Sequence, residues 1–245
     1  MNTLFIGQNL ISLKSVDSTN TFLLNLSNNE KIVEGTVVHA ENQIKGRGQR
    51  NNSWISDGGK SLCLSVLFYP KLDLSHQFTF NKCIALALVS SLNVLGVKSF
   101  IKWPNDIFVN DKKIAGVLIE NSIREKKLQK SIVGIGINAN NNCSDIESAT
   151  SLKEVLNADI GMKELLSSLC QELEKYYLLF RNDKNQIQDL YHSYLYKKDC
   201  LVNFTKEDYQ FSAIVKEVDD FGRLILIEKG VEKAYSVGEL SFNLF

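Results

Sequence analysis

Three strand patterns follow one another over residues 99–139 with only short connections between them. They are SFIKW (99–103), KIAGVLIEN (113–121) and SIVGIGINA (131–139). Between the first two, DIFVNDKKI predicts a hairpin that turns at Asn110–Asp111. Long helical patterns lie on either side, at 77–96 and 161–180. Hairpin-linked strands between helices predict an α+β fold class, with a mixed or antiparallel sheet and flanking helices.

The remaining patterns predict a second, smaller unit at the C-terminus. The other elements expected before it are strands at 10–16, 35–41 and 61–69, a helix that follows the capping residues DSTN (17–20), and a helix at 186–195. After YKKD the chain changes to short strand patterns separated by the turn sequences DDFG and EKG. We therefore expect a main domain over residues 1–196 and a small β-barrel domain over residues 197–245.

Charge and composition argue against several classes of protein. The 28 basic and 28 acidic residues balance, whereas a general nucleic-acid binder usually carries a basic excess, so we expect no DNA partner. The N-terminus has no basic lead before a long apolar run, and the most apolar stretch (83–97) is short and interrupted by polar residues. Neither a signal peptide nor a membrane span is expected. The five cysteines include no Cys-x-x-Cys pair and the three histidines have no ligand spacing, which predicts no metal site, no disulfide framework and a cytoplasmic location.

Several short segments contain chemically useful residues, but each is ambiguous alone. The loop GRGQRNNSW (46–54) places cations on a pliable backbone, yet most charged surface loops have no function. DSTN is first of all a helix N-cap, and a lysine that begins a strand, as Lys113 does in KIAGVLIE (113–120), is most often a solvated edge lysine. The glycines of GIGIN (134–138) allow close backbone approach.

Taken in order, these segments resemble the biotin protein ligase family. The family's glycine-arginine-glycine loop stands here as GRGQRNNSW, its Lys-Trp-Pro-Asn-Asp element as KWPND (102–106), and its Lys-(Leu/Ile)-Ala-Gly-(Ile/Val)-Leu-(Ile/Val)-Glu strand as KIAGVLIE. The resemblance runs from about Leu10 to about Asn140. It implies a class II synthetase-like catalytic domain that binds biotin and ATP, followed by a small SH3-like β-barrel.

The resemblance also implies a reaction and a set of site residues. Such an enzyme joins biotin to ATP, giving biotinyl-adenylate and pyrophosphate, and then transfers biotin to a lysine of a biotin carboxyl carrier protein. Both reactants are anions, so cations on a glycine loop would screen their repulsion. The implied catalytic residues are Lys113 and Arg47. The implied substrate-binding residues are Ser18, Thr19, Asn20, Gln43, Arg47, Gly48, Gln49 and Lys113. The implied nucleotide-binding residues are Gly46, Trp54, Asp106 and Asn138, whereas Trp103 is expected to pack.

The chain departs from the family's common loop, which reads Gly-Arg-Gly-Arg-x-Gly-Arg-x-Trp. Gln49, Asn51 and Asn52 replace an arginine, a glycine and an arginine. Asparagine tolerates positive φ, which rationalises Asn51. Gln49 removes a charge that the neighbouring Arg50 could supply, although adjacent side chains of an extended loop point apart. The first motif begins at residue 17, which leaves no room for the helix-turn-helix that makes some members repressors, so we expect no operator binding.

The resemblance implies biotin and ATP (as MgATP) as substrates, no tightly bound cofactor, a carrier protein as partner, no membrane association and a possible homodimer.

Two rival functions stay open beside this one. A lipoate or octanoate–protein ligase or transferase has a related fold and chemistry, but the unbroken motif set favours biotin. A non-enzymatic ligand-binding module could use the basic loop and the C-terminal barrel, but Lys113 beside a phosphate-type loop favours an enzyme.

Overall fold

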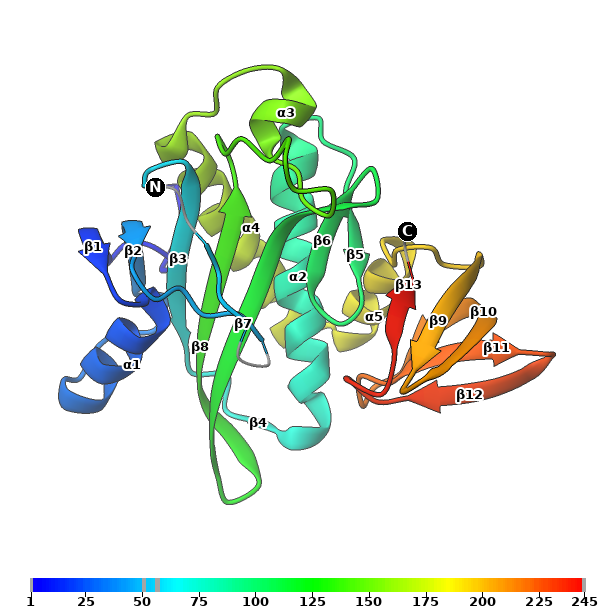
Figure 1. The fold of residues 1–245 in the computed structure, drawn as a ribbon. Coiled ribbons are helices and arrows are strands. Elements are labelled where there is room, and N and C mark those ends of the chain that lie inside the picture. The colour runs from blue at the N-terminus through cyan, green and yellow to red at the C-terminus, as the bar shows by residue number, and fades with distance from the viewer. Residues whose placement is uncertain (1, 50–51, 56–57, 244–245) are drawn as a thin grey trace.

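The main body of the protein is a mixed sheet covered by helices (Figure 1). The computed structural model describes residues 2–49, 52–55 and 58–243. Within them, the sheet follows the order β1-β2-β3-β8-β7-β6-β5, and β4 pairs with β8. Its strands are β1 (Leu10–Val16), β2 (Val37–Gln43), β3 (Ser61–Phe68), β4 (Leu72–Asp73), β5 (Phe100–Lys102), β6 (Asp106–Val109), β7 (Lys112–Arg124) and β8 (Lys127–Asn138). Only β1 and β2 pair in parallel, and the other neighbours are antiparallel.

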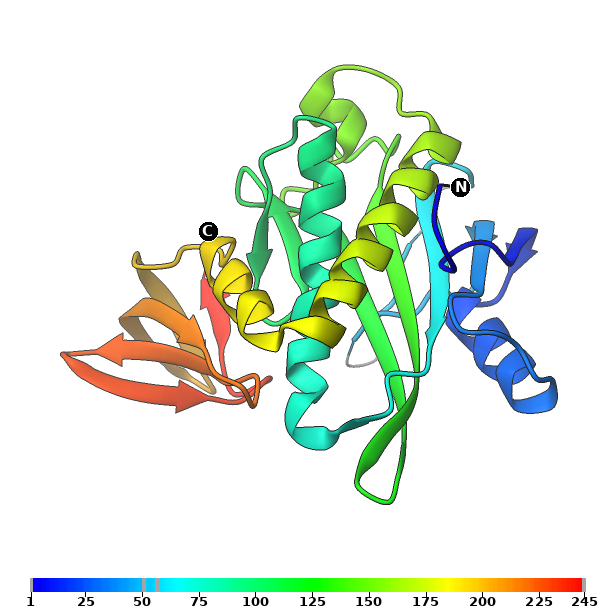
Figure 2. The same cartoon turned by 180° about the vertical axis from the view of Figure 1, so that it is seen from behind.

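The helices lie on both faces of this sheet. They are α1 (Thr19–Asn29), the short 3-10 helix η2 (Leu74–His76), α2 (Gln77–Val94), α3 (Leu152–Leu156), α4 (Met162–Asn182) and α5 (Lys184–Ser193). Figure 2 shows α2 and α4 crossing one face of the sheet, with α5 beside them. Nearly every side chain of α2 from Thr79 to Leu92 is buried, as expected for a helix enclosed between the sheet and other helices.

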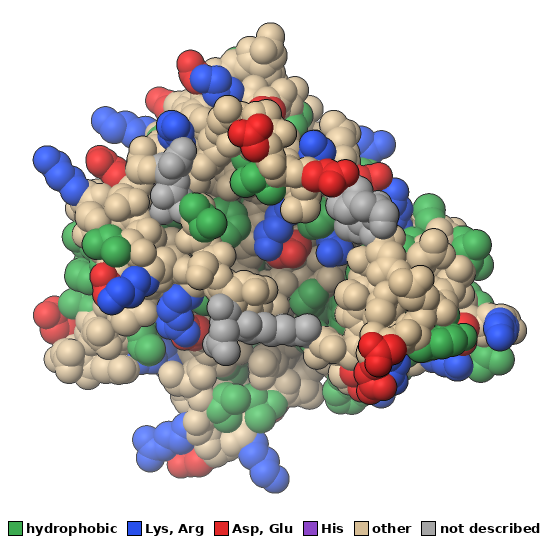
Figure 3. Space-filling view, viewed as in Figure 1, with side chains coloured by type: hydrophobic (Ala, Val, Ile, Leu, Met, Phe, Trp, Pro, Cys, Tyr) green, Lys and Arg blue, Asp and Glu red, His purple; other side chains and the backbone are tan. Residues whose placement is uncertain are grey.

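A smaller apolar cluster holds α1 against the opposite face. It contains Leu23 of α1, Val38 of β2, Leu67 of β3 and Ile132 of β8, all fully buried. Since side chains alternate along a strand, these residues define the face that α2 and α4 do not cover. Helix α1 covers only part of this second face. Figure 3 looks toward the open part, where the surface is hollowed near its centre.

The C-terminal strands form a separate antiparallel sheet. Its order is β12-β11-β10-β9-β13. The strands are β9 (Leu201–Lys206), β10 (Tyr209–Val218), β11 (Leu224–Glu228), β12 (Val231–Tyr235) and β13 (Ser241–Asn243). The boundary expected between residues 196 and 197 lies in the segment that joins α5 to β9. No helix in the described part of the chain is long and apolar enough to span a membrane.

The predicted fold class is confirmed, and most predicted elements are present within a few residues. The predicted hairpin turns at Asn110 and Asp111, whose φ values of 49° and 63° match the left-handed conformation that tight hairpin turns require. Strands β7 and β8 extend beyond the prediction into a second hairpin at Glu125 and Lys126. The predictions did not include β4, α3 or β13.

Candidate functional site

The floor of the candidate site is made of small residues on the open face of the sheet. Gly134 and Gly136 of β8 share a face with Ile132, because alternate residues of a strand point the same way. Ser65 of β3 lies opposite Gly134. Gly116 of β7 lies opposite Gly136. Where α1 no longer covers the sheet, these residues leave a pocket that opens to solvent.

The predicted residues converge on this pocket. All the predicted substrate-binding residues line it, namely Ser18, Thr19, Asn20, Gln43, Arg47, Gly48, Gln49 and Lys113. Two of the predicted nucleotide-binding residues, Trp54 and Asp106, line it as well. Gly46 borders a shallower surface depression nearby. Asn138 is not among the residues that line either cavity, and its Nδ2 donates instead to the carbonyl of Thr150 (3.1 Å).

One end of the pocket is polar and uncharged. Ser18 occupies the N-cap position of α1, but its side chain makes no capping hydrogen bond. Gln43 Oε1 accepts from the backbone N–H of Thr19 (2.9 Å) and from its hydroxyl (3.0 Å). Ser65 Oγ lies 2.6 Å from Oδ1 of Asn20 and 2.7 Å from Oγ1 of Thr19. The DSTN segment is therefore more than a helix cap, since its buried side chains form a fixed array of donors and acceptors.

Glu120 ties this end of the pocket to the glycine loop. Its Oε2 accepts from Nδ2 of Asn20 (2.9 Å), and its Oε1 pairs with the guanidinium of Arg47 (2.8 Å). Arg47 also reaches Oγ1 of Thr21 (3.4 Å). A carboxylate that receives both groups orients the Asn20 amide and draws the loop toward α1.

Lys113 provides positive charge at the other end of the pocket. Its Nζ lies 2.7 Å from Oδ1 of Asp106, and its Cε and Nζ lie over Gly116. The side chains are 35% and 28% exposed, so both groups are accessible to a ligand. Strand β7 lies between β6 and β8, and Lys113 is therefore not the solvated edge lysine considered above. Asn105 supports the arrangement, because its Nδ2 donates to the carbonyl of Val117 and fastens KWPND to β7.

The Trp54 indole closes the pocket above the floor. Its ring lies directly against Gly136, where any Cβ would collide with it. The indole Nε1 is buried and has no hydrogen-bond partner among the described residues. The glycine at position 136 is thus required by close approach of an aromatic ring. The N–H is a donor that a bound ligand could satisfy.

The two described cations at the loop, Lys45 and Arg47, are paired with carboxylates. Lys45 pairs with Asp17 (3.3 Å), and both side chains are exposed. Gln49 lines the pocket at the position where the common family loop has arginine. The compensating role considered for Arg50, and the backbone argument for Asn51, concern positions outside the described residues. Of the loop cations that are described, Arg47 alone lines the main pocket.

Sequence reasoning overlooked the residues that support the site from behind. Glu120 is the last residue of the KIAGVLIE motif, and its position on a strand of otherwise apolar residues was a usable signal. Ser65 lies in the strand pattern 61–69, where a polar residue at an alternating position also marked the site face. In the described residues no group of three or more histidine, cysteine or acidic side chains could hold a metal ion. No disulfide joins any of the five cysteines, all of which lie in the described residues.

Comparisons with known proteins agree with this geometry. The profile of the Biotin/lipoate A/B protein ligase family matches residues 12–138. The bifunctional ligase/repressor BirA of Bacillus spizizenii is 30% identical, over 96% of this chain and 75% of its own length. The biotin–[acetyl-CoA-carboxylase] ligase of Mycobacterium tuberculosis is 27% identical, over 91% of this chain and 85% of its own.

A solved structure extends the likeness to nearly the whole chain. The biotin protein ligase from Aquifex aeolicus in complex with biotin and ATP has a TM-score of 0.79 at 27% identity, and the match covers 96% of this chain and 99% of that one. The match includes the C-terminal sheet as well as the pocket-bearing body. The chain therefore belongs to the biotin/lipoate A/B protein ligase family and is a biotin ligase enzyme of that family.

Proposed function

We propose that this enzyme activates biotin with ATP to give biotinyl-adenylate and transfers the biotinyl group to a lysine of a biotin carboxyl carrier protein. The observation that carries the proposal is the division of one pocket into an uncharged polar end and a cationic end, joined by a glycine floor. Biotin has the same division, with a neutral ureido ring at one end and a carboxylate at the other. Relatives whose names record biotin ligation, and a similar structure that holds biotin and ATP, support the assignment.

The uncharged end suits a ureido group. Thr19 and Asn20 present fixed hydroxyl and amide groups, and Gln43 is held by Thr19. A ureido ring has one carbonyl acceptor and two N–H donors, so it needs both kinds of partner. A charged side chain here would have to be desolvated by a neutral ring, which is unfavourable. Glu120 stays behind Asn20 and acts by orienting its amide.

The cationic end suits the bond-forming step. A carboxylate oxygen of biotin attacks the α-phosphorus of MgATP, the bond to the pyrophosphate oxygen breaks, and pyrophosphate leaves with the electron pair. Lys113 stabilises the negative charge that increases as the two anions meet, and Asp106 holds the Lys113 ammonium in place. Arg47, the other proposed catalytic cation, is paired with Glu120 beside Asn20 and would have to leave that carboxylate to join Lys113. The glycines of the floor let two site side chains pack closely on the sheet, the Lys113 side chain over Gly116 and the Trp54 ring over Gly136. In the second step the amine of the carrier lysine attacks the acyl carbon, and AMP leaves.

The proposal has a defined scope. It includes a catalytic domain over residues 1–196 and a small C-terminal domain over residues 197–245. It includes MgATP as a substrate, no tightly bound cofactor, a cytoplasmic location and a possible homodimer. It does not include operator binding. Nucleotide contacts by Gly46, Trp54, Asp106 and Asn138 are part of it, with Asn138 acting indirectly through Thr150.

Intact-mass measurement of a carrier domain tests the proposal. The purified protein is incubated with MgATP and a biotin carboxyl carrier domain, with biotin in one reaction and lipoate in a parallel one. We expect the mass of one biotinyl group on the carrier in the biotin reaction alone, and none when the acceptor lysine is replaced by arginine or when ATP is omitted. Equal or exclusive labelling by lipoate would assign the enzyme to the lipoate branch. No labelling by either acid would overturn the proposed reaction.

A further inference from the structure

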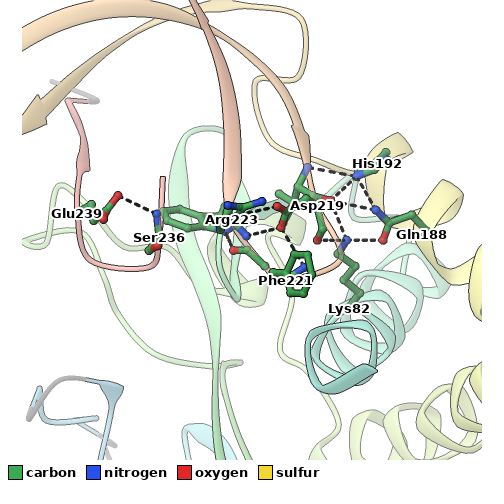
Figure 4. A network of polar contacts seen from close by, with 11 residues as sticks. Lys82, Gln188, His192, Asp219, Phe221, Arg223, Ser236 and Glu239 are labelled. Atoms are coloured by element: carbon green, nitrogen blue, oxygen red, sulfur yellow. Dashed lines mark hydrogen bonds and ion pairs between the residues drawn. The ribbon is translucent and has the colours of Figure 1, made fainter. Parts of the chain in front are cut away.

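One turn of the C-terminal sheet packs against the helices of the main fold, and Phe242 of β13 makes a separate contact with Lys102. This turn, residues 219–223 between β10 and β11, is seated against α2 and α5 (Figure 4). The carboxylate of Asp219 shapes it by accepting from the backbone N–H groups of Phe221 (3.0 Å) and Arg223 (2.8 Å). The Phe78 ring of α2 lies directly against Gly222, where a Cβ would collide with it and where φ is +84°. The Asp219 bonds thus fix the shape of the turn, and Gly222 lets it pack closely against α2.

Two helices each contribute a pair of side chains one turn apart. On α2 the pair is Phe78 and Lys82, and on α5 it is Gln188 and His192. Lys82 Nζ donates to the backbone carbonyls of Val218 (2.8 Å) and Asp219 (3.0 Å). It also donates to Oε1 of Gln188. The Gln188 amide donates to the carbonyl of Val218 (3.0 Å), and the Val218 N–H donates to Nε2 of His192 (3.2 Å). Figure 4 shows these groups converging on one end of the turn.

Lys82 is an unusual residue for its position. It is fully buried in the second turn of an apolar helix, with its Nζ within 5.5 Å of the Phe78 and Tyr191 ring centroids. The titratable groups around it are Glu217, Asp219 and Asp220 of the turn region and Tyr191 and His192 of α5. A well-packed apolar side chain often stabilises a core more than a buried charge does. The three N–H groups of an ammonium match its three acceptors, so Lys82 contributes directional bonds rather than stability.

The docked turn is connected to the candidate site through Trp103. The indole Nε1 of Trp103 donates to the carbonyl of Gly222 (2.9 Å), and the Tyr191 hydroxyl donates to the carbonyl of Pro104 (3.4 Å). Both contacts fall on the KWPND segment, whose last residue, Asp106, holds Lys113. Lys82 therefore lies behind the turn, and the turn lies behind the cationic end of the pocket. None of these contacts reaches the uncharged end of the pocket.

We propose that Lys82 is a positioning residue for adenylate formation, because it fixes the β10–β11 turn and the turn fixes KWPND beside Lys113. The expected effect on the use of ATP rests on the proposed function. The expected loosening of Trp103 does not. Loss of the Lys82 bonds should loosen Trp103 and misplace Asp106. Use of ATP should therefore suffer, while biotin binding at the uncharged end should not.

The test uses three variants of the whole chain. Lys82→Met keeps the volume and removes the donors, Gln188→Ala weakens the same contact more mildly, and Lys163→Met changes an exposed lysine of α4 as the matched control. The first readout is the indole N–H signal of Trp103 by NMR, assigned with Trp54→Phe, since the chain has two tryptophans. In Lys82→Met and Gln188→Ala its exchange with solvent should accelerate relative to backbone amides of β3 and β8. A general loss of stability would accelerate both alike.

The second readout separates the two substrates in biotin-dependent ATP–pyrophosphate exchange. Losing a charge-assisted hydrogen bond should raise the KM for ATP by roughly tenfold in Lys82→Met, with the KM for biotin within about twofold of wild type. Gln188→Ala should shift the same parameter less, and Lys163→Met should shift neither. Equal change of both KM values, or unchanged Trp103 exchange in folded variants, would overturn the inference. If wild type lacked exchange activity the proposed function would fail, and the indole readout alone would still decide the role of Lys82.

Discussion

Replacing Lys113 by methionine should remove catalysis and leave the fold intact. The methionine side chain can keep the aliphatic contact over Gly116, and the backbone bonds from Lys113 N–H to the Ser148 carbonyl (2.9 Å) and from Thr150 N–H to the Lys113 carbonyl (2.9 Å) do not involve the side chain. The lost ion pair with Asp106 is partly exposed and contributes up to about 1 kcal/mol of stability. A cation that acts in the transition state contributes about 10²–10³ in rate, or roughly 3–4 kcal/mol.

Pyrophosphate exchange and thermal unfolding together check this prediction. Lys112→Met is the matched control, since the adjacent side chain on β7 points to the other face of the strand. It should retain exchange activity, whereas Lys113→Met should lose about two to three orders of magnitude. The double variant Lys113→Met/Asp106→Asn removes both charges. If Lys113 served only to neutralise Asp106, the double variant would recover activity, and that recovery would refute the assigned role.

Three further predictions concern other parts of the molecule. Gln49→Arg should slow escape of biotinyl-adenylate by about tenfold, because an ionised donor binds phosphate more strongly than an amide, and an unchanged dissociation rate in a biotin chase would contradict this. Glu120→Gln should weaken biotin binding by about tenfold in calorimetry, since the charge that orients Asn20 and Arg47 is lost, and unaltered affinity would show that Glu120 is dispensable. Burial lowers the pKa of Lys82 from 10.5 to about 8, so the unfolded chain binds more protons between these values and stability should rise with pH across that window. The rise attributable to Lys82 is on the order of 3 kcal/mol, and it should be absent from denaturation curves of Lys82→Met.

The sequence predicted the parts of the fold that local patterns determine. The hairpin at Asn110–Asp111 was predictable because its residue types favour positive φ. The second hairpin at Glu125–Lys126 was not, because these residues have no such preference and long-range pairing of β7 with β8 imposes the turn. Short elements such as α3 and β13 have too few residues to show a period.

The site residues were likewise predictable from local motifs but not from long-range contacts. Motif order predicted a set of site residues, and all of them except Gly46 and Asn138 line one pocket. It did not identify Ser65 or Glu120, whose roles depend on contacts with Asn20 across 45 and 100 residues of sequence. Nor could it show that Lys82 is buried against the C-terminal turn, because a lysine in a helical pattern is ordinarily solvent-facing. Partners brought together by tertiary structure leave no local pattern.

An isotope-transfer experiment tests the central claim most directly. Biotin labelled with heavy oxygen in both carboxylate positions is incubated with the enzyme, MgATP and a carrier domain, and the released nucleotide is analysed by mass spectrometry. If the carboxylate attacks the α-phosphate and the carrier lysine then displaces AMP, the AMP should contain one heavy oxygen and the carrier amide should retain the other. Unlabelled AMP, or heavy oxygen in pyrophosphate or phosphate, would contradict the account.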